Sequence, residues 1–271
     1  MIFDLHIHTN YSDGLLTPQQ VIHLAIAKKL DGIAITDHDN VDGIESAVQY
    51  SKTKNKIHVI PGIEFGCIFK DEEVHILGYF IDYKSSKLKE ITENLKINRV
   101  KRGIEMVSKI NKLGMKIDID EVQLMAKDNY IGRPHIARAL VKHGYVSNIK
   151  EAFELYLNRG KDAYVERDTL KIDEAINLIH TLNGIAVLAH PGILKDRRII
   201  EYCINIGIDG IEAIHSKHNS KDVKYLLNVA KLHKLIITGG SDCHGELIYG
   251  EYLLGKYYVN IDYVPVMKGR L

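Results

Sequence analysis

The sequence predicts an α/β protein built as a (β/α) barrel with a helical insertion. Short apolar runs rich in β-branched residues alternate with segments of helical periodicity, which is typical of parallel strands joined by crossover helices. Four of these runs end in His or Asp, near residues 8, 38, 190 and 244, and barrel folds place their chemistry at strand ends. The length of 271 residues fits one barrel or two ordinary domains, so the order of predicted strands and helices must decide between them.

The first half of the barrel is predicted from strands at 2–8, 32–37, 57–68 and 73–82. Helices are expected from about 17 to 29 and from about 42 to 54, between these strands. Thr17 and Pro18 predict where the first helix starts, because a Thr side chain can cap a helix and proline suits its first position.

The rhythm then changes, since residues 86 to about 160 are almost wholly helical in pattern. That stretch is too long for one crossover, so we expect a helical insertion at 96–166 that covers part of the barrel mouth, with the barrel itself at 1–95 and 167–271. Strands at 185–189, 208–214 and 235–240 and helices at 171–182, 196–206 and 219–233 complete the barrel.

The composition, 45% hydrophobic and 26% charged, is that of a globular protein and argues against disorder. The formal net charge is +1, but residues 96–166 carry 14 Lys and Arg against 9 Asp and Glu, which suggests an anionic substrate or, equally, a solvated helical face. Cys67, Cys203 and Cys243 lack the spacing of a disulfide framework or zinc ribbon and fit a reducing cytoplasm. No apolar run approaches the ~20 residues of a membrane span, so we expect no membrane partner and see no obligatory protein partner.

The first candidate metal ligands are His6 and His8, which project to the same side of a strand because side chains alternate along it. Asp13 follows in a polar turn, from which a carboxylate can reach back over the rim. His38 ends the next apolar run. An isolated His pair on a strand is a weak signal, so the recurrence of ligands at successive strand ends carries the prediction.

Carboxylates accompany these histidines. Asp37 and Asp39 flank His38, and holding the turn or capping the next helix explains them as well as chemistry does. Glu64 stands among apolar residues, where a carboxylate is costly to bury without a cation, so a metal is favoured over a salt bridge. His75, in the following strand, is either a ligand or a half-exposed strand residue.

The second half of the chain adds three more candidates. His190 ends the most apolar strand, while Asp242 and His244 share one face of the last strand, which turns Cys243 away into the packing. Six His with several carboxylates exceed what one zinc ion needs and suit two or three divalent ions, Mn²⁺, Fe²⁺ or Zn²⁺. Such clusters activate a bridging water and neutralise the oxygens of a phosphoester.

Taken in order, these motifs resemble the PHP (polymerase and histidinol phosphatase) family. The resemblance rests on the segments at 4–9, 12–14, 35–38, 61–64, 75, 189–191 and 240–244. It implies a distorted seven-stranded (β/α) barrel, TIM-like, that holds up to three metal ions.

Carried over residue by residue, the resemblance implies three ion sites. One would be formed by His6, His8, Glu64 and Asp242, a second by Asp13, His38 and His244, and a third by Glu64, His75 and His190. Asp13 and His38 are also the expected catalytic residues. Every ligand position of the family's trinuclear form is filled.

The insertion narrows the resemblance. Segments 130–138 and 156–165 look like the branch of stand-alone enzymes that hydrolyse nucleotides, including nucleoside 3′,5′-bisphosphate phosphatases and 5′-to-3′ exoribonucleases, in which the insertion forms a wall of the substrate cleft. Arg133 and His135 are then candidates for substrate contact, with Arg159 and Lys161 behind them. The alternative for Arg133 is that, with Pro134, it merely starts a helix.

His215 and His218 follow the strand at 208–214 and are expected at the same rim, where they would contact the scissile phosphate or protonate the leaving oxygen; a surface pair is the alternative, and His215 is the favoured catalytic residue. The sequence thus predicts a cytoplasmic, metal-dependent phosphoesterase in which a metal-activated hydroxide releases inorganic phosphate or a nucleotide from a nucleotide or short RNA. The alternatives are a small-molecule phosphomonoesterase similar to histidinol phosphatase, a metal-dependent amidohydrolase, and a non-catalytic PHP module that binds nucleic acid.

Overall fold

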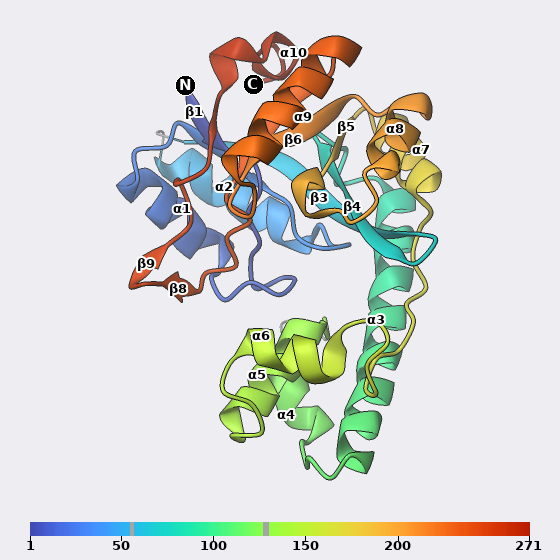
Figure 1. The fold of residues 1–271 in the computed structure, drawn as a ribbon. Helices are drawn as coiled ribbons and strands as arrows, with labels where there is room; N and C mark the ends of the chain where they lie inside the picture. Colours follow the sequence, from blue (N-terminus) through green and yellow to red (C-terminus); the bar gives the residue numbers. More distant parts are fainter. Residues whose placement is uncertain (55–56, 127–129) are drawn as a thin grey trace.

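The structure is a computed structural model that describes residues 1–54, 57–126 and 130–271 (Figure 1). Its main element is a mixed eight-stranded sheet, in the order β10-β1-β2-β3-β4-β5-β6-β7, that curls into a nearly closed barrel. The strands are β1 (Ile2–Asp4), β2 (Gly32–Ile35), β3 (His58–Phe69), β4 (Glu72–Tyr79), β5 (Ile185–Leu188), β6 (Gly210–His215), β7 (Ile236–Gly240) and β10 (Val259–Asn260). The predicted α/β barrel, with seven strands in sequence order, is confirmed.

The barrel closes where the chain beyond β1 meets the chain beyond β7. Ile7 forms a parallel bridge with Cys243, and Asp242 donates its N–H to the carbonyl oxygen of His6 at 2.9 Å. The prediction of one strand over 2–8 was therefore wrong in detail, because β1 ends at Asp4 and the following residues pair with a loop. His6 and His8 lie on that irregular segment at the rim.

Helices cover the outside of the barrel (Figure 1). They are α1 (Pro18–Ala27), α2 (Asp42–Lys54), α7 (Ile172–Thr181), α8 (Arg198–Asn205), α9 (Ser220–His233) and the short α10 (Pro265–Lys268), with 3-10 turns at Pro191–Ile193 and Ile261–Tyr263. The predicted start of α1 is confirmed: the Thr17 hydroxyl accepts from the N–H of Gln20 at 3.2 Å, and the Gln20 side chain accepts from the N–H of Thr17 at 2.8 Å. None of the described helices combines the length and apolar content needed to cross a membrane.

Among β1 to β7, one strand runs against the others; β10 also pairs antiparallel with β1. β4 pairs antiparallel with both β3 and β5, whereas β1, β2, β3 and then β5, β6, β7 pair in parallel. The sequence pattern predicts this strand without its direction, and the connection explains it: Lys70 and Asp71 alone join β3 to β4, too short a link for a crossover. The start of β4, with His75, therefore reaches the rim where the parallel strands end.

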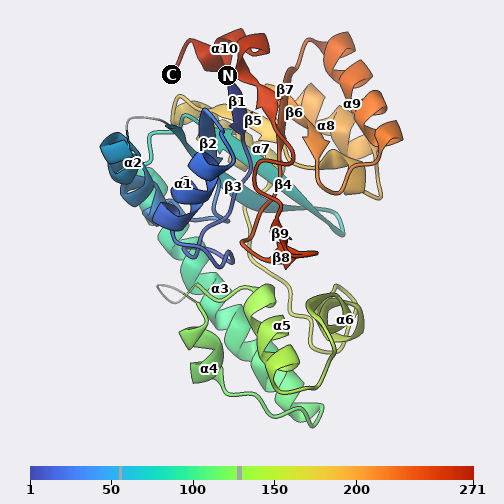
Figure 2. The same ribbon diagram turned by 90° about the vertical axis from the view of Figure 1, so that its left-hand side faces the viewer.

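The helical insertion stands beside the barrel (Figure 2). It comprises most of α3 (Ser86–Lys112), then α4 (Ile119–Leu124), α5 (Arg133–Lys142), α6 (Ile149–Ala152) and a π-helical turn (Phe153–Leu157). Leu88 and Leu95 of α3 pack in the barrel core, while Met106 and Ile110 pack in a separate core within the insertion. The two-stranded ribbon of β8 (Leu247–Ile248) and β9 (Glu251–Tyr252) lies near α5 and α6 in both views.

Candidate metal centre

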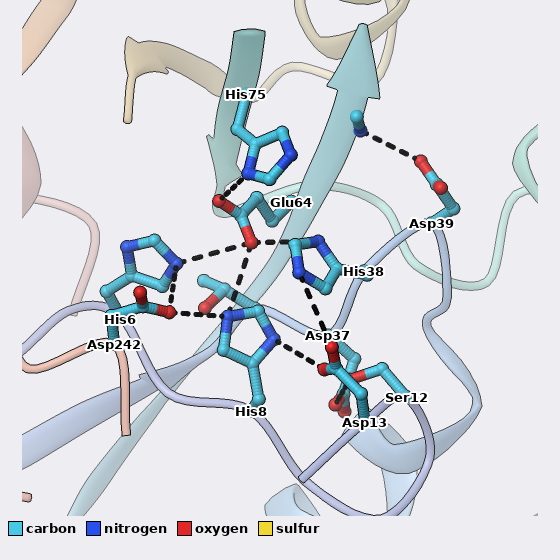
Figure 3. Close-up of polar contacts among 12 residues, drawn as sticks. His6, His8, Ser12, Asp13, Asp37, His38, Asp39, Glu64, His75 and Asp242 are labelled. Atoms are coloured by element: carbon cyan, nitrogen blue, oxygen red, sulfur yellow. Dashed lines mark hydrogen bonds and ion pairs between the residues drawn. The ribbon is translucent and has the colours of Figure 1, made fainter. Parts of the chain in front are cut away.

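The nine residues predicted as metal ligands lie together at one rim of the barrel. Figure 3 shows His6, His8, Asp13, His38, Glu64, His75 and Asp242 pointing toward one another. They come from the segments after β1, β2, β5 and β7 and from β3 and β4 themselves. The nine are His6, His8, Asp13, His38, Glu64, His75, His190, Asp242 and His244. Residues from the whole length of the chain thus meet in one cluster.

Glu64 lies at the centre of this cluster and is fully buried. Its Oε2 atom is 2.9 Å from Nδ1 of His38 and 3.2 Å from Nε2 of His8. Its Oε1 atom is 2.9 Å from Nδ1 of His75 and 3.1 Å from Nε2 of His190. Each carboxylate oxygen of Glu64 therefore faces a different pair of imidazoles.

Asp13 and Asp242 stand on either side of His8. Oδ1 of Asp242 is 3.2 Å from Nε2 of His8, and Oδ1 of Asp13 is 3.3 Å from Nε2 of His244. The Nδ1 atom of His244 lies 2.9 Å from the backbone carbonyl oxygen of Asp242, to which it donates. His244 therefore turns the lone pair of Nε2 toward a carboxylate, an arrangement that is unfavourable unless a cation or proton lies between them.

His6 is oriented in the same way. Its Nδ1 atom donates to the carboxylate of Glu212 at 3.1 Å, which leaves the Nε2 lone pair facing Oε2 of Glu64 at 3.4 Å and Oδ1 of Asp242 at 3.6 Å. A carboxylate behind a metal-binding histidine commonly fixes its tautomer in this way.

Several buried polar atoms of the cluster have no hydrogen-bond partner. They include Nε2 of His6, both ring nitrogens of His8, Oδ1 of Asp13, Nδ1 of His38 and Oε2 of Glu64. Buried polar atoms without hydrogen bonds are rare and cost free energy of folding. Imidazole nitrogens and carboxylate oxygens can instead coordinate a divalent cation directly. Among the described residues, the sets whose possible ligand atoms lie within 4.8 Å of one another are His8, Asp13, His38, His244; His6, Glu212, His215; His6, His8, Glu64; and His38, Glu64, His75. The donor set thus fits bound metal ions.

Burial and charge oppose each other in the cluster. Burial alone would lower the pKa of His8, but the carboxylates of Asp242 and Glu64 raise that pKa to about 10. Burial would raise the pKa of Asp13, yet the neighbouring histidines hold that pKa well below its usual range. The carboxylates thus favour positive charge at His8, as they would favour a divalent cation, while burial lowers the pKa of His38 and lowers that of His190 to about 4.

The route by which Asp242 and His244 reach the cluster differs from the prediction. β7 ends at Gly240, and Asp242 adopts a left-handed backbone conformation with φ of +55°. They therefore do not share a strand face. The turn after β7, bridged to the segment after β1 through Cys243, brings both side chains to the rim.

Asp37 and Asp39, whose roles the sequence left open, both hold structure. Asp37 accepts from the N–H of Thr9 at 2.7 Å and from its hydroxyl at 2.6 Å, which fixes the loop leading to Asp13. Asp39 accepts from Nε of Arg99 at 2.9 Å and so ties the rim to α3.

Glu212, on β6, was missed by the sequence reasoning. It is fully buried and also accepts from the N–H of His190 at 2.7 Å. The sequence could have identified Glu212, because this carboxylate lies between Ile211 and Ala213 in an apolar strand. The cost of burying a carboxylate identified Glu64 in the same way.

His215 and His218 have different environments. The N–H of Lys217 donates to Nδ1 of His215 at 3.1 Å, so Nε2 of His215 carries the proton; that Nε2 lies 3.5 Å from Oδ2 of Asp242. Both nitrogens of His218 instead bond to backbone, with Gly192 and Ala213. His215 therefore lies at the cluster. His218 instead links two backbone segments through hydrogen bonds.

A cleft of about 240 Å³ opens over the cluster. Residues of the insertion side and of the barrel line it together, including Arg99, Arg102, Arg133, Phe153 and Arg167 with the metal-binding candidates and Lys217. A larger open hollow of about 840 Å³ lies on α3 and α4 but includes none of the predicted site residues. The chemistry therefore belongs to the smaller cleft.

The predicted substrate contacts are only partly brought together. Arg133 lines the cleft, and Arg159 lines an adjoining recess. Lys161 is exposed and lines neither. His135 is buried and lines neither as well: its Nδ1 accepts from the N–H of Gly132 at 3.0 Å, and burial lowers its pKa to about 4.

Comparison with known proteins gives consistent matches. The family model for the PHP domain matches residues 4–184. The 5′-3′ exoribonuclease Rnm of Escherichia coli is 32% identical over 250 residues, which cover 90% of this chain and 85% of that protein. The 3′,5′-nucleoside bisphosphate phosphatase of Chromobacterium violaceum is 31% identical over 248 residues, covering 89% and 86% respectively.

Two solved structures share the fold. A protein of Bifidobacterium adolescentis, described as a predicted metal-dependent phosphoesterase, superposes with a TM-score of 0.89 and 30% identity, covering 97% of this chain and 94% of that one. A protein of Chromobacterium violaceum described as an amidohydrolase, with bound sulfate and no metal, gives a TM-score of 0.85 and 30% identity, covering 90% and 87%.

Proposed function

This chain belongs to the PHP domain family, and we propose that it hydrolyses phosphate esters of nucleotides, acting on a nucleoside 3′,5′-bisphosphate or on the 5′ end of a short RNA. It is a hydrolase, in keeping with the exoribonuclease and phosphatase activities for which its relatives are named. The observation that carries the proposal is the set of buried imidazole nitrogens and carboxylate oxygens that face one another without hydrogen bonds.

We assign two or three divalent ions, Mn²⁺, Fe²⁺ or Zn²⁺, to this cluster. The mixture of imidazole and carboxylate donors suits these metals, and a bridging Glu64 suits more than one ion. The residues that would hold them are His6, His8, Asp13, His38, Glu64, His75, His190, Asp242 and His244. Such ions lower the pKa of water and neutralise phosphoryl oxygens.

The surrounding side chains complement this chemistry. Lys217, whose Nζ is 2.9 Å from Oδ2 of Asp242, and Arg133 line the cleft and offset the negative charge of a phosphoryl group. The neutral His215 ring, whose Nδ1 accepts the N–H of Lys217, directs its Nε2–H toward the cluster, so we assign it a hydrogen bond to the scissile phosphate. Asp13 and His38, which both line the cleft, are assigned catalytic roles as metal ligands.

We further propose that the insertion at 96–166 forms one wall of the substrate cleft. Arg133 and Phe153 contribute to the cleft lining opposite the barrel residues, and Arg159 lines the recess beside it. This geometry supports Arg133 and Arg159 as substrate contacts. It gives no such support to His135, Lys161 or His218.

The state of the three cysteines indicates the kind of cellular compartment in which the protein works. Cys67, Cys203 and Cys243 are all free and buried, and none is among the assigned ligands. Burial raises the pKa of Cys243, which makes its thiol unreactive. Unpaired thiols suit a reducing environment, so we propose a cytoplasmic location.

A screen of phosphate release in Mn²⁺-supplemented buffer tests the proposal. The substrates are a nucleoside 3′,5′-bisphosphate, a short 5′-phosphorylated RNA and histidinol phosphate. We expect turnover of one or both nucleotide substrates at least about tenfold above histidinol phosphate, a discrimination of ~1.4 kcal/mol. Preferred hydrolysis of histidinol phosphate would support the small-molecule alternative, and nucleic-acid binding without turnover would support the non-catalytic one.

A further inference from the structure

None of the nine assigned metal ligands lies in the insertion at 96–166, yet one insertion side chain reaches the loops that carry two of them. This residue is Arg138 on α5, whose side chain is 15% exposed. Its Nη2 atom donates to the backbone carbonyl oxygen of Asp13 at 2.8 Å and to Oε1 of Glu246 at 3.1 Å. One guanidinium nitrogen thus links the insertion to the loop after β1 and to the loop after β7.

These two loops supply metal ligands that face each other. Oδ1 of Asp13, on the first loop, lies 3.3 Å from Nε2 of His244, on the second, and Glu246 follows His244 by two residues. The loops also meet through their backbones, since the N–H of Leu15 donates to the carbonyl oxygen of His244 at 2.8 Å. The separation between the two ligands therefore depends on how the loops are held against each other.

Close packing does not hold the insertion against the second loop at this place. A hollow of about 210 Å³ is lined by Pro134 and Ile149 of the insertion and by Cys243 and His244 of the loop, and Arg138 lines it too. Side chains that face a hollow lose the dispersion contacts that would fix their distance. The hydrogen bonds of Arg138 therefore take over this positioning.

The chemistry of the guanidinium gives Arg138 two effects of opposite sign on metal binding. As a positive charge near the cluster it repels metal ions. As a rigid planar donor it holds two acceptors in a fixed relative position, and groups that orient metal ligands in this way strengthen metal binding. The direction in which metal affinity changes when Arg138 is replaced therefore distinguishes charge from positioning.

We propose that Arg138 is a positioning residue that holds Asp13 and His244 at the separation at which both bind one divalent ion. The inference rests on the proposed function, which assigns metal ions to this cluster. Arg138 touches neither the ion nor the reacting atoms, and it acts through the loop of Asp13 and through Glu246. The insertion thus takes part in metal binding without supplying a ligand.

The test titrates Mn²⁺ calorimetrically into the chelator-treated full chain. Arg138→Gln should weaken the binding of one ion about 10- to 100-fold, the scale typical of groups that orient metal ligands. Arg138→Lys, which keeps the charge and a donor but not the plane, should lie between Arg138→Gln and wild type. Unchanged or tighter Mn²⁺ binding by Arg138→Gln would overturn the proposal.

Lys142→Gln is the matched control. It removes a positive charge from the same helix, α5, at an exposed position where Lys142 pairs with Glu121 at 2.6 Å. This variant should bind Mn²⁺ as the wild type does. A loss equal to that of Arg138→Gln would show that any charge removed from α5 has the same effect, and would overturn the proposal.

A double-mutant cycle shows whether Arg138 acts through Asp13. Asp13→Ala removes the carboxylate ligand but keeps the backbone carbonyl oxygen, so Arg138→Gln in that background should cause no further loss of Mn²⁺ affinity. Additive losses would mean a general effect on the fold and would overturn the positioning role. If Arg138→Gln does not fold, Arg138→Lys carries the same cycle, and wild-type Mn²⁺ affinity in that variant would overturn the proposal.

These titrations need no substrate, so the two proposals can fail separately. Arg138-dependent Mn²⁺ binding by a protein that hydrolyses neither nucleotide substrate keeps the positioning role and overturns the proposed function. Nucleotide hydrolysis by the wild type, together with wild-type Mn²⁺ affinity in Arg138→Gln, does the reverse.

Discussion

Replacing Glu212 by Gln tests how the barrel orients its metal ligands. The buried Glu212 carboxylate accepts from Nδ1 of His6 at 3.1 Å and from the N–H of His190 at 2.7 Å. Gln keeps the shape but has one acceptor oxygen, so one of these buried donors then faces an amide NH₂ group. Partners of this kind contribute about 10- to 100-fold to metal affinity, or ~1.4–2.7 kcal/mol. We therefore expect Glu212→Gln to weaken Mn²⁺ binding by that factor.

The assay titrates Mn²⁺ into chelator-treated protein and follows both heat of binding and phosphate release. Because Glu212 acts through His6, kcat should return toward the wild-type value at saturating Mn²⁺. Glu201→Gln on the exposed face of α8 is the matched control and should bind Mn²⁺ as the wild type does. Wild-type Mn²⁺ affinity in Glu212→Gln would refute the orienting role.

Three further predictions concern other parts of the molecule. Asp13→Ala and His38→Ala should each lower kcat/KM by at least about 100-fold with an unchanged circular-dichroism spectrum, and near-normal turnover would contradict their assignment. Leu140→Ala, in the insertion core, should lower the free energy of unfolding in urea by about 2–5 kcal/mol while leaving bound metal unchanged; loss of metal would show that the two cores are not independent. Gly66→Ala places a Cβ 2.0 Å from Nη2 of Arg167, so it should displace that guanidinium and raise KM for nucleotides, and an unchanged KM would contradict this.

Much of the rim could be predicted because its ligands follow apolar strand-like runs. His38 and His190 are found by that pattern alone, and Glu64 by the cost of burying a carboxylate among apolar residues. His75 was predicted as a ligand, but the antiparallel direction of β4, which brings it to the rim, was not. That direction follows from the short link between β3 and β4. Strand pattern locates ligands along the chain without giving strand direction.

Contacts made by distant segments were the least predictable. Glu212 binds His6 across 206 positions of sequence, and no spacing rule pairs them. His135 was expected at the substrate from the resemblance of segment 130–138, but it is 1% exposed and its Nδ1 accepts from the N–H of Gly132.

The most direct test of the central claim measures phosphate release by the full chain before chelation, after chelation, and after Mn²⁺ is restored, with bound metal determined by elemental analysis in each state. We predict two or three ions per chain, loss of nucleotide hydrolysis on their removal, and recovery with Mn²⁺. Near-normal turnover from the metal-stripped protein would contradict the account.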